Sequence, residues 1–365
     1  MKVQAIVLPH YGIGDFLTHL PFVNALLKQF PKNQFIIFTK SRTKAKSLLR
    51  DQKNVKIYYI RDKNNFFSSS FDFFSLRNFF LKENIIKIWI FHRSPRFAII
   101  SFFSKVREIL GFGYGIQKQF LNSGKCLNKN FKNSFPVVKG YEFLKTNSIN
   151  LNPLNPFLKV SEKEIINIKK KFKLLPKPWI LIGFSSTDQS RTWKSHYFIQ
   201  LIQLLNKLCK YTFFLVGAPY EKQDAKKIIK LVKIKKGKIK NFCKPIDQTM
   251  ALMHQSKFYI GNDAGNAHLS LACGLKTYII HGGSPPYSHT VYKNYYPNKF
   301  LNNLKPILPP DGVIRNPNLR TIDTVPQEKG MDLIKPENKI RHILDLEPNV
   351  TILPQSRHPT GVIGV

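Results

Sequence analysis

An aspartate follows two closely spaced glycines near the start of the chain, where an apolar run ends and a helical pattern begins. Gly12 and Gly14 let the backbone approach a ligand closely, and the first amides of a helix suit an anion. Asp15 has two interpretations: a helix N-cap, which is common for Asp, or an ionised carboxylate that acts as a general base. The loop fits neither GxxxxGK[ST] nor GxGxxG, so it indicates neither a nucleotide P-loop nor a dinucleotide-binding turn.

A second loop rich in hydroxyl groups covers residues 183–194, again between an apolar run and a helical pattern. The hydroxyls of Ser186 and Thr187, the main-chain amides and the guanidinium of Arg191 are together suited to holding a phosphate. The alternative is a solvated loop in which Ser195 is the N-cap of the next helix.

A third loop of the same kind covers residues 261–268, with Asp263 and Gly265 at the helix start and His268 one turn into the helix. Asp263 is suited to accepting a hydrogen bond from a ligand, and the helix N-terminus to facing a diphosphate. A lone helical histidine is usually structural, but we expect His268 to point back toward the loop. Residues 281–286 (HGGSPP) form a fourth turn after an apolar run.

Alternating strands and helices are expected to position these loops, and such alternation indicates parallel α/β sheets. Expected strands cover residues 3–8, 34–39, 55–60, 85–91, 179–184, 211–217, 257–261 and 276–281. Expected helices cover residues 16–30, 71–82, 96–110, 161–174, 195–210, 221–233, 264–273 and 336–345. Residues 150–156 (NLNPLNP) are typical of a linker between two halves. Because ligands bind outside the carboxyl ends of parallel strands, we expect a site in the cleft between the halves.

The composition is that of a folded, strongly basic protein. The chain has 365 residues, which suggests roughly two domains, and 43% of them are hydrophobic, which excludes a disordered protein. Fifty-eight Lys and Arg against 21 Asp and Glu give a formal charge of +37, which favours polyanionic partners or phosphorylated substrates. Compositional drift toward lysine is the alternative explanation. The four cysteines form no CxxC pair, so a structural zinc site is not expected, and no apolar run reaches the ~20 residues of a membrane span.

Several motifs, in order along most of the chain, resemble glycosyltransferase family 9, the ADP-heptose:lipopolysaccharide heptosyltransferases. The opening GIGDFLTHLPFVNALLKQFP is similar to that family's GxGDxL…P…L…P start. Residues 259–286 (YIGNDAGNAHLSLACGLKTYIIHGGSPP) resemble its D[TS]G…H…A…G.P segment, and residues 191–193 its [KR]xW element. Residues 331–343 (MDLIKPENKIRHI) resemble its closing helix.

This resemblance implies a GT-B fold, an α/β architecture of two Rossmann-like domains that face each other across a cleft. We expect an acceptor-binding domain at residues 1–158, a nucleotide-sugar-binding domain at 159–335, and a helix with an irregular tail at 336–365. It further implies an inverting reaction that uses no cofactor and no metal. Asp15 would deprotonate the acceptor, and Gly12 and Gly14 would form the loop around it. The donor would be held by Ser186, Thr187, Arg191, Glu221, Asp263, Ala264, Gly265 and His268.

The implied partners are an ADP-sugar donor, most simply ADP-heptose, and a phosphorylated, lipid-linked saccharide of the lipopolysaccharide core or lipid A. The implied location is cytoplasmic, peripheral to the anionic inner face of the inner membrane. Ala264 departs from the family's usual Ser or Thr, so a different nucleotide-sugar donor stays open, as does a degenerate, non-catalytic member. A basic nucleic-acid-binding protein is a further alternative, but no binding motif supports it and we expect no specific nucleic acid partner.

Overall fold

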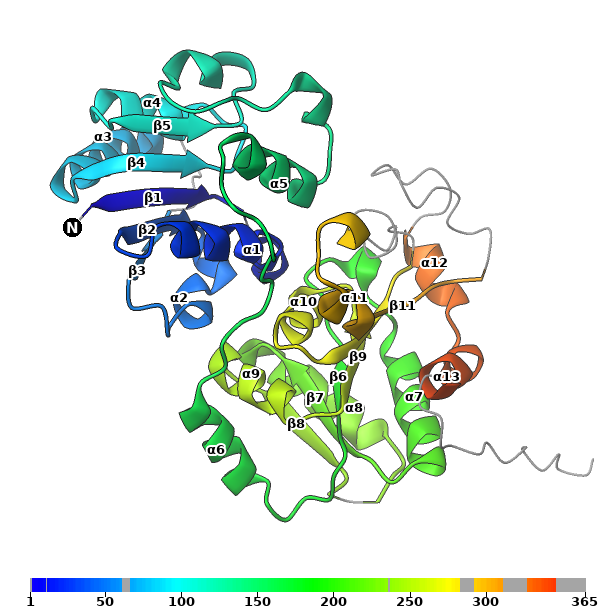
Figure 1. Cartoon of the computed structure of the whole chain (residues 1–365). Helices are drawn as coiled ribbons and strands as arrows, with labels where there is room; N and C mark the ends of the chain where they lie inside the picture. Colours follow the sequence, from blue (N-terminus) through cyan, green and yellow to red (C-terminus); the bar gives the residue numbers. More distant parts are fainter. Residues whose placement is uncertain are drawn as a thin grey trace, which may run out of the picture.

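Two parallel β-sheets, each covered by helices on both faces, make up the computed structural model (Figure 1). The structure describes residues 2–10, 12–60, 66–235, 237–282, 292–310 and 327–345. Of the predicted regions, the fourth turn beyond residue 282 and the tail beyond residue 345 lie outside these ranges. Among the described residues, no helix is both long enough and apolar enough to cross a bilayer.

The first sheet has the strand order β3-β2-β1-β4-β5. Its strands are β1 (Val3–Leu8), β2 (Gln34–Thr39), β3 (Val55–Tyr59), β4 (Ile85–Ile90) and β5 (Glu108–Gly111). The helices of this half are α1 (Ile13–Gln29), α2 (Ala45–Leu48), α3 (Phe66–Lys82), α4 (Arg96–Phe103) and α5 (Pro136–Thr146). Short 3-10 turns are η1 (Ser41–Thr43), η2 (Gly115–Phe120) and η3 (Lys129–Phe131).

The second sheet has the strand order β11-β10-β9-β6-β7-β8. Its strands are β6 (Trp179–Gly183), β7 (Thr212–Gly217), β8 (Ile239–Cys243), β9 (Phe258–Asn262), β10 (Lys276–Ile280) and β11 (Leu304–Ile307). The helices are α6 (Glu162–Lys171), α7 (Ser195–Leu208), α8 (Lys222–Leu231), α9 (Ile246–His254), α10 (Gly265–Ala272), α11 (Asn298–Asn303), α12 (Gln327–Leu333) and α13 (Pro336–Asp345). The 3-10 turns are η4 (Gln189–Arg191), η5 (Pro219–Glu221) and η6 (Tyr292–Asn294).

Alternating side chains divide the buried apolar residues into three clusters. One lies between the first sheet and α3 and α4, and another between the second sheet and α7, α8 and α13. The third covers the remaining face of both sheets and runs from α1 and α5 to α9 and α10 without a break. Because α1 packs against α10, the two halves share apolar packing as well as a linker.

The helix expected at residues 96–110 is shorter than the periodicity indicated. It ends at Phe103, and Lys105 then takes a left-handed conformation with φ of 54°, which no α-helix continues through. The chain turns there and enters the edge strand β5, which pairs with β4. The strands β8 and β11 and the helices α5 and α9 were not predicted from the sequence.

Candidate active site between the two sheets

The strand orders place the loops that carry predicted site residues at the carboxyl ends of the strands in each sheet. In the second sheet, the chain order reverses between β6 and β9, which lie side by side. In the first sheet, it reverses between β1 and β4. Ligands of open parallel sheets bind at such reversals, outside the carboxyl ends of the strands. Asp15 follows β1, whereas Arg191 and Asp263 follow β6 and β9, so both sheets present predicted site residues at their reversal points.

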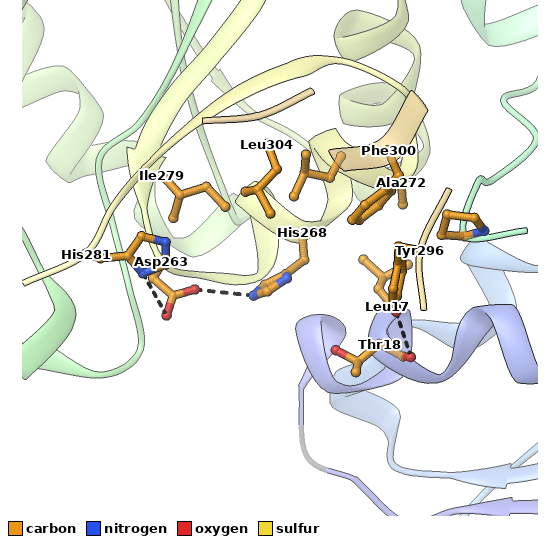
Figure 2. Close-up of a pocket in the computed structure, with 12 residues that line it drawn as sticks. Leu17, Thr18, Asp263, His268, Ala272, Ile279, His281, Tyr296, Phe300 and Leu304 are labelled. Carbon is orange, nitrogen blue, oxygen red and sulfur yellow. Dashed lines mark hydrogen bonds and ion pairs between the residues drawn. The ribbon is translucent and has the colours of Figure 1, made fainter. Parts of the chain in front are cut away.

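A buried aspartate is the centre of the second-half site. The Asp263 side chain is only 4% exposed, and its two oxygens face Arg191 and the two histidines His268 and His281, of which Figure 2 shows the histidines. His268 Nε2 lies 3.3 Å from Oδ1, while Arg191 Nη1 and His281 Nδ1 lie 3.5 and 3.9 Å from Oδ2. Burial alone would raise the pKa of Asp263, but the hydrogen bond from His268 and the charges of His281 and Arg191 outweigh it and lower that pKa well below its ordinary value. Asp263 therefore carries a negative charge that holds the basic groups around it.

The loop that carries Arg191 is held by its own turn. Asp188 Oδ1 accepts hydrogen bonds from the amide and hydroxyl of Ser190, and Asp188 Oδ2 lies 3.2 Å from Arg191 Nε. Ser186 Oγ accepts from the Asp188 amide, and Thr187 is exposed at the tip of the turn. The guanidinium is thus fixed between two carboxylates while 39% of the Arg191 side chain stays exposed.

Trp193 anchors the end of the same loop to the protein interior. Its amide donates to Asn262 Oδ1 at 2.9 Å, which ties the loop to the last residue of β9. Its indole Nε1 donates to the carbonyl of Ile334 at 2.9 Å, next to α13. The side chains of Trp193 and Asn262 are both buried. Trp193 was predicted only as part of a motif, and Asn262 was not predicted, because a buried amide next to a candidate aspartate gives no sequence signal of its own.

Glu221 lies at the same sheet edge, after β7. Its Oε2 accepts a hydrogen bond from the amide of Ala218 at 2.5 Å, which caps the turn before α8. Burial raises the pKa of the Tyr259 hydroxyl, and the charges of Glu221 and Asp263 raise it further. The charges of both carboxylates therefore act on one buried tyrosine, although their loops follow β7 and β9, which β6 separates.

Asp15 is exposed in the first turn of α1, and Gly12 is the N-cap. Its Oδ2 accepts a hydrogen bond from the Gly12 amide at 3.1 Å. The side chain therefore closes the helix start from the N3 position instead of being the N-cap that one sequence interpretation suggested. This contact fixes the direction of the carboxylate and leaves it at the surface of the first sheet's reversal point.

The starts of α1 and α10 meet at the boundary between the two halves. A Cβ atom added to Gly14 would lie 2.8 Å from His268 Cδ2, and one added to Gly265 would lie 3.3 Å from Ile13 Cβ. Ala264 is the N-cap of α10 and has no side-chain oxygen to occupy the helix amides. The imidazole of His268 fills the space that a side chain at position 14 would take, so the first turn of α1, which carries Asp15, lies against the helix that carries His268.

A small interdomain cavity of about 30 Å³ continues behind His268 (Figure 2). Apolar side chains of α1, α10 and α11 line most of it, and Asp263, His268 and His281 close one end. Tyr296 donates a hydrogen bond from its hydroxyl to the carbonyl of Thr18 at 3.2 Å, so it connects the second half to α1. No sequence motif pointed to Tyr296.

Three histidines cluster beside α1 at the reversal point of the first sheet. The rings of His10 and His19 stack with centroids 4.3 Å apart, and the His92 ring lies 6.1 Å from that of His10. His19 Nδ1 donates to the carbonyl of Asp15 at 2.8 Å. Burial lowers the pKa of His19 to about 4, and burial together with Arg93 and Lys139 also lowers that of His92. The cluster is therefore uncharged near neutral pH and supports the helix that carries Asp15.

The structure thus brings Gly14 from the first half next to His268 from the second, and Ile13 next to Gly265, with Gly12 and Asp15 in the same first turn of α1. Arg191 and Asp263 are in contact with each other, and His268 contacts Asp263. Ser186 and Thr187 belong to the Arg191 loop, and Glu221 lies two strands away from Asp263. Within the described ranges, no group of three or more His, Cys, Asp or Glu residues is arranged to hold a metal ion. The roles of these residues stay predictions.

Comparison with solved structures shows the same fold over nearly the whole chain. Heptosyltransferase II of E. coli matches with a TM-score of 0.63 and 16% identity, covering 94% of this chain and 100% of its own. A family 9 glycosyltransferase from Veillonella parvula matches with a TM-score of 0.71 and 14% identity, covering 95% and 97%. E. coli heptosyltransferase WaaC with ADP-2-deoxy-2-fluoro heptose matches with a TM-score of 0.63 and 15% identity, covering 95% and 99%. The predicted GT-B fold is confirmed.

The search of curated protein sequences found no match. The family model of glycosyltransferase family 9 (heptosyltransferase) matches residues 93–303, more than half of the chain. That match includes the Arg191 loop and the Asp263 cluster, and the shared fold extends the likeness to the half that carries Asp15. The chain therefore belongs to glycosyltransferase family 9, the heptosyltransferase family, and is a glycosyltransferase.

Proposed function

We propose that this enzyme transfers heptose from ADP-heptose, with inversion and without a metal, onto a phosphorylated, lipid-linked saccharide of the lipopolysaccharide core. The observation that supports this most directly is the close approach of Gly14 to His268. It brings the first turn of α1, which carries the exposed Asp15, against His268, one of the basic groups of the second half. Transfer from a sugar nucleotide needs a base for the acceptor hydroxyl and positive charge for the departing diphosphate.

On the donor side, the diphosphate binds at the reversal point of the second sheet. The exposed edge of Arg191 and the hydroxyls of Ser186 and Thr187 face it from the loop after β6. The amides at the start of α10 face it from the loop after β9, since Ala264 supplies no competing side-chain cap. As the sugar–oxygen bond breaks, negative charge grows on the diphosphate, and Arg191 and the helix dipole stabilise it.

Asp263 organises this positive surface rather than binding the diphosphate itself. A buried carboxylate repels a phosphate, but it fixes the guanidinium of Arg191 and the imidazole of His268, whose other edges face outward. His268 then contacts the sugar or its phosphate between the two halves. Glu221, beyond β7, accepts a hydrogen bond from the nucleoside hydroxyls.

On the acceptor side, Asp15 removes the proton of the attacking hydroxyl. Inversion requires attack from the face of the sugar opposite the leaving group, so the base and the diphosphate-binding groups must lie on opposite sides of the anomeric carbon. A base on α1 and leaving-group stabilisers after β6 and β9 meet this requirement. Gly12 and Gly14 leave room for the acceptor to approach the carboxylate.

The acceptor is proposed to reside in the anionic cytoplasmic face of the inner membrane, where the enzyme binds peripherally. A formal charge of +37 supports this, because each basic residue near such a surface contributes on the order of 1 kcal/mol of attraction. Family membership gives no role to a specific nucleic acid, and a positive field of this size also attracts phosphorylated saccharides.

The test is transfer from a panel of sugar nucleotides, including ADP-heptose, ADP-glucose, UDP-glucose and GDP-mannose, onto heptose-free lipopolysaccharide acceptor with and without EDTA. We expect the fastest transfer from ADP-heptose, no effect of EDTA, and a product with inverted anomeric configuration by NMR. Transfer from a different sugar nucleotide but not from ADP-heptose would refute the assignment of the donor sugar. Ala264, which replaces the family's usual Ser or Thr, is then the first residue to mutate. Loss of activity in EDTA that iron or another metal restores would refute metal independence.

A further inference from the structure

A row of exposed phenylalanines runs across α3 and α4 on the outside of the first half. We define the aromatic patch as Phe73, Phe74, Phe102, Phe103 and Phe120. Phe74, Phe102 and Phe103 are 61%, 50% and 53% exposed. Neighbouring ring centroids lie 5.6 Å apart for Phe73 and Phe74, 6.2 Å for Phe73 and Phe103, 5.6 Å for Phe102 and Phe103, and 5.7 Å for Phe102 and Phe120. The patch is therefore continuous.

The outer rings of the patch lie outside the apolar core beneath it. Leu76 and Phe80 of α3 and Phe97 and Ile100 of α4 are buried against the first sheet, and Phe73 and Phe120 pack partly against them. Phe74, Phe102 and Phe103 are mainly exposed, and leaving their rings in water is unfavourable. Contiguous exposed apolar surface on a folded protein marks a contact site.

The patch lies in a basic part of the chain. Residues 72–108 contain seven Lys and Arg and three acidic residues, Asp72, Glu83 and Glu108; Glu83 is paired with Lys56 at 3.2 Å and Glu108 with Lys87 at 2.8 Å. Arg77 donates from Nε to the carbonyl of Phe103 at 3.2 Å, which holds its guanidinium beside the rings. Lys105 and Arg107 are exposed directly after α4. The surface thus combines aromatic rings with a strong positive charge.

We propose that the aromatic patch docks this enzyme on the surface of an anionic phospholipid bilayer, with the rings inserted at the headgroup level and the basic rim on the lipid phosphates. Aromatic side chains favour this interface, and basic residues bind its negative charge. The proposal deepens the proposed function, on which it rests in one respect: a lipid-linked acceptor gives the enzyme a reason to work at a membrane.

Two other occupants fit the surface less well. Single-stranded nucleic acid stacks its bases on flat aromatic platforms, but these rings meet edge to face, with interplanar angles of 87°, 69°, 90° and 77° along the row. A second copy of the chain would bring two strongly basic surfaces together, and like charges across an interface are repulsive. A bilayer matches both the irregular rings and the charge.

The position of the patch is compatible with catalysis. Figure 1 shows α3 and α4 at the end of the first half that lies away from the second sheet. The patch lies on the half that carries Asp15, the side on which the acceptor is proposed to bind. Docking through it leaves the second half, with the donor-binding residues, away from the bilayer and accessible to a soluble sugar nucleotide.

The test is co-sedimentation of the full-length chain with vesicles, without any sugar nucleotide. The vesicles contain phosphatidylethanolamine with phosphatidylglycerol, or phosphatidylcholine alone. We expect binding to the anionic vesicles only, weakened by salt, and a loss of about tenfold or more in the partition coefficient for the double variant Phe102→Ser/Phe103→Ser. Lys105→Gln/Arg107→Gln should also weaken binding and flatten its salt dependence. The matched control is Leu231→Ser, which removes a lone apolar side chain that is 62% exposed on a lysine-rich helix, and it should bind like the wild type.

Unchanged vesicle binding by the double phenylalanine variant, an equal loss in Leu231→Ser, or no binding by the wild type would each overturn the proposal. So would a change from dimer to monomer in the phenylalanine variant without a change in vesicle binding, because the patch would then be a contact between copies. Transfer onto a water-soluble acceptor, measured in parallel, separates this outcome from a failure of the proposed function. The double variant should keep that activity, whereas an enzyme that binds vesicles but transfers no heptose would contradict the function alone.

Discussion

Replacing Gly14 by alanine should lower activity without lowering stability. Gly14 lies in the first turn of α1, where alanine is favoured over glycine by about 0.5–1 kcal/mol of helix propensity. The added methyl would, however, lie 2.8 Å from His268 Cδ2 and 3.4 Å from Cγ and Nε2. Carbon atoms prefer separations of about 3.5–4.0 Å, so the imidazole must retreat by about 0.7 Å or more.

The consequence for the site follows from the hydrogen bond between His268 and Asp263. That contact is already long at 3.3 Å, so a retreat on this scale disrupts it or misplaces the ring. A displacement of about 1 Å in an active site costs up to roughly 100-fold in rate. We therefore expect kcat/KM to fall about 10- to 100-fold while the melting temperature stays the same or rises slightly.

The assay combines initial rates of ADP release with thermal unfolding, and Gly140→Ala is the control. A Cβ on Gly140 would lie 2.3 Å from Phe22 Cε2 in the core of the first half, so overpacking there should lower stability by about 1–3 kcal/mol and leave kcat/KM nearly unchanged well below the melting temperature. The reasoning would be refuted if Gly14→Ala kept wild-type activity, or if its activity loss matched a loss of stability.

Three further predictions concern pH and the donor. The pKa of His19 is about 4 in the folded protein against about 6.5 in the unfolded chain, so protons bind the unfolded chain preferentially. Neutral His19 therefore contributes its full stabilisation above about pH 6.5. This contribution is lost as the pH falls toward 4, which lowers the free energy of unfolding by about 2–3 kcal/mol at pH 4.5. Urea unfolding at pH 7 and 4.5 measures this, and His19→Gln should reduce the pH dependence; an unchanged dependence would contradict it. Arg191→Gln should raise the KM for the donor about tenfold or more, whereas Lys194→Gln, whose lysine pairs with Asp332, should not. Glu221→Gln should weaken ADP binding in calorimetry about tenfold, and equal weakening by Asp224→Asn would exclude a specific role.

The sequence predicted the α/β fold because strand and helix periodicities alternate clearly in both halves. The apolar runs at β6 and β7 are fully buried strands and that at β1 is buried except for Val3, and their pattern needs no tertiary context. Short edge strands were missed. Residues 304–307 include a proline, and residues 239–243 alternate only partly, so both become strands through pairing with their neighbours β10 and β7.

The site could be predicted only in part, for a physical reason. Asp15, Arg191 and Asp263 each follow a strand and precede a helix, which is a local signal. The contact of Gly14 with His268 depends on how two helices from different halves pack, and no local pattern encodes it. The same holds for Asn262 and Tyr296, which act through a loop and a helix distant in sequence.

The measurement that tests the account most directly is the rate of ADP-heptose transfer by Asp15→Asn, with ADP-heptose affinity measured separately by calorimetry. The amide keeps an oxygen for the Gly12 hydrogen bond but cannot take a proton, and the exposed Asp51→Asn is the control. We predict a fall in kcat of about 10²- to 10⁴-fold, donor affinity within about twofold of the wild type, and an unchanged rate for the control. An Asp15→Asn enzyme that transfers heptose at the wild-type rate would contradict the assignment of this carboxylate as the base between the two sheets.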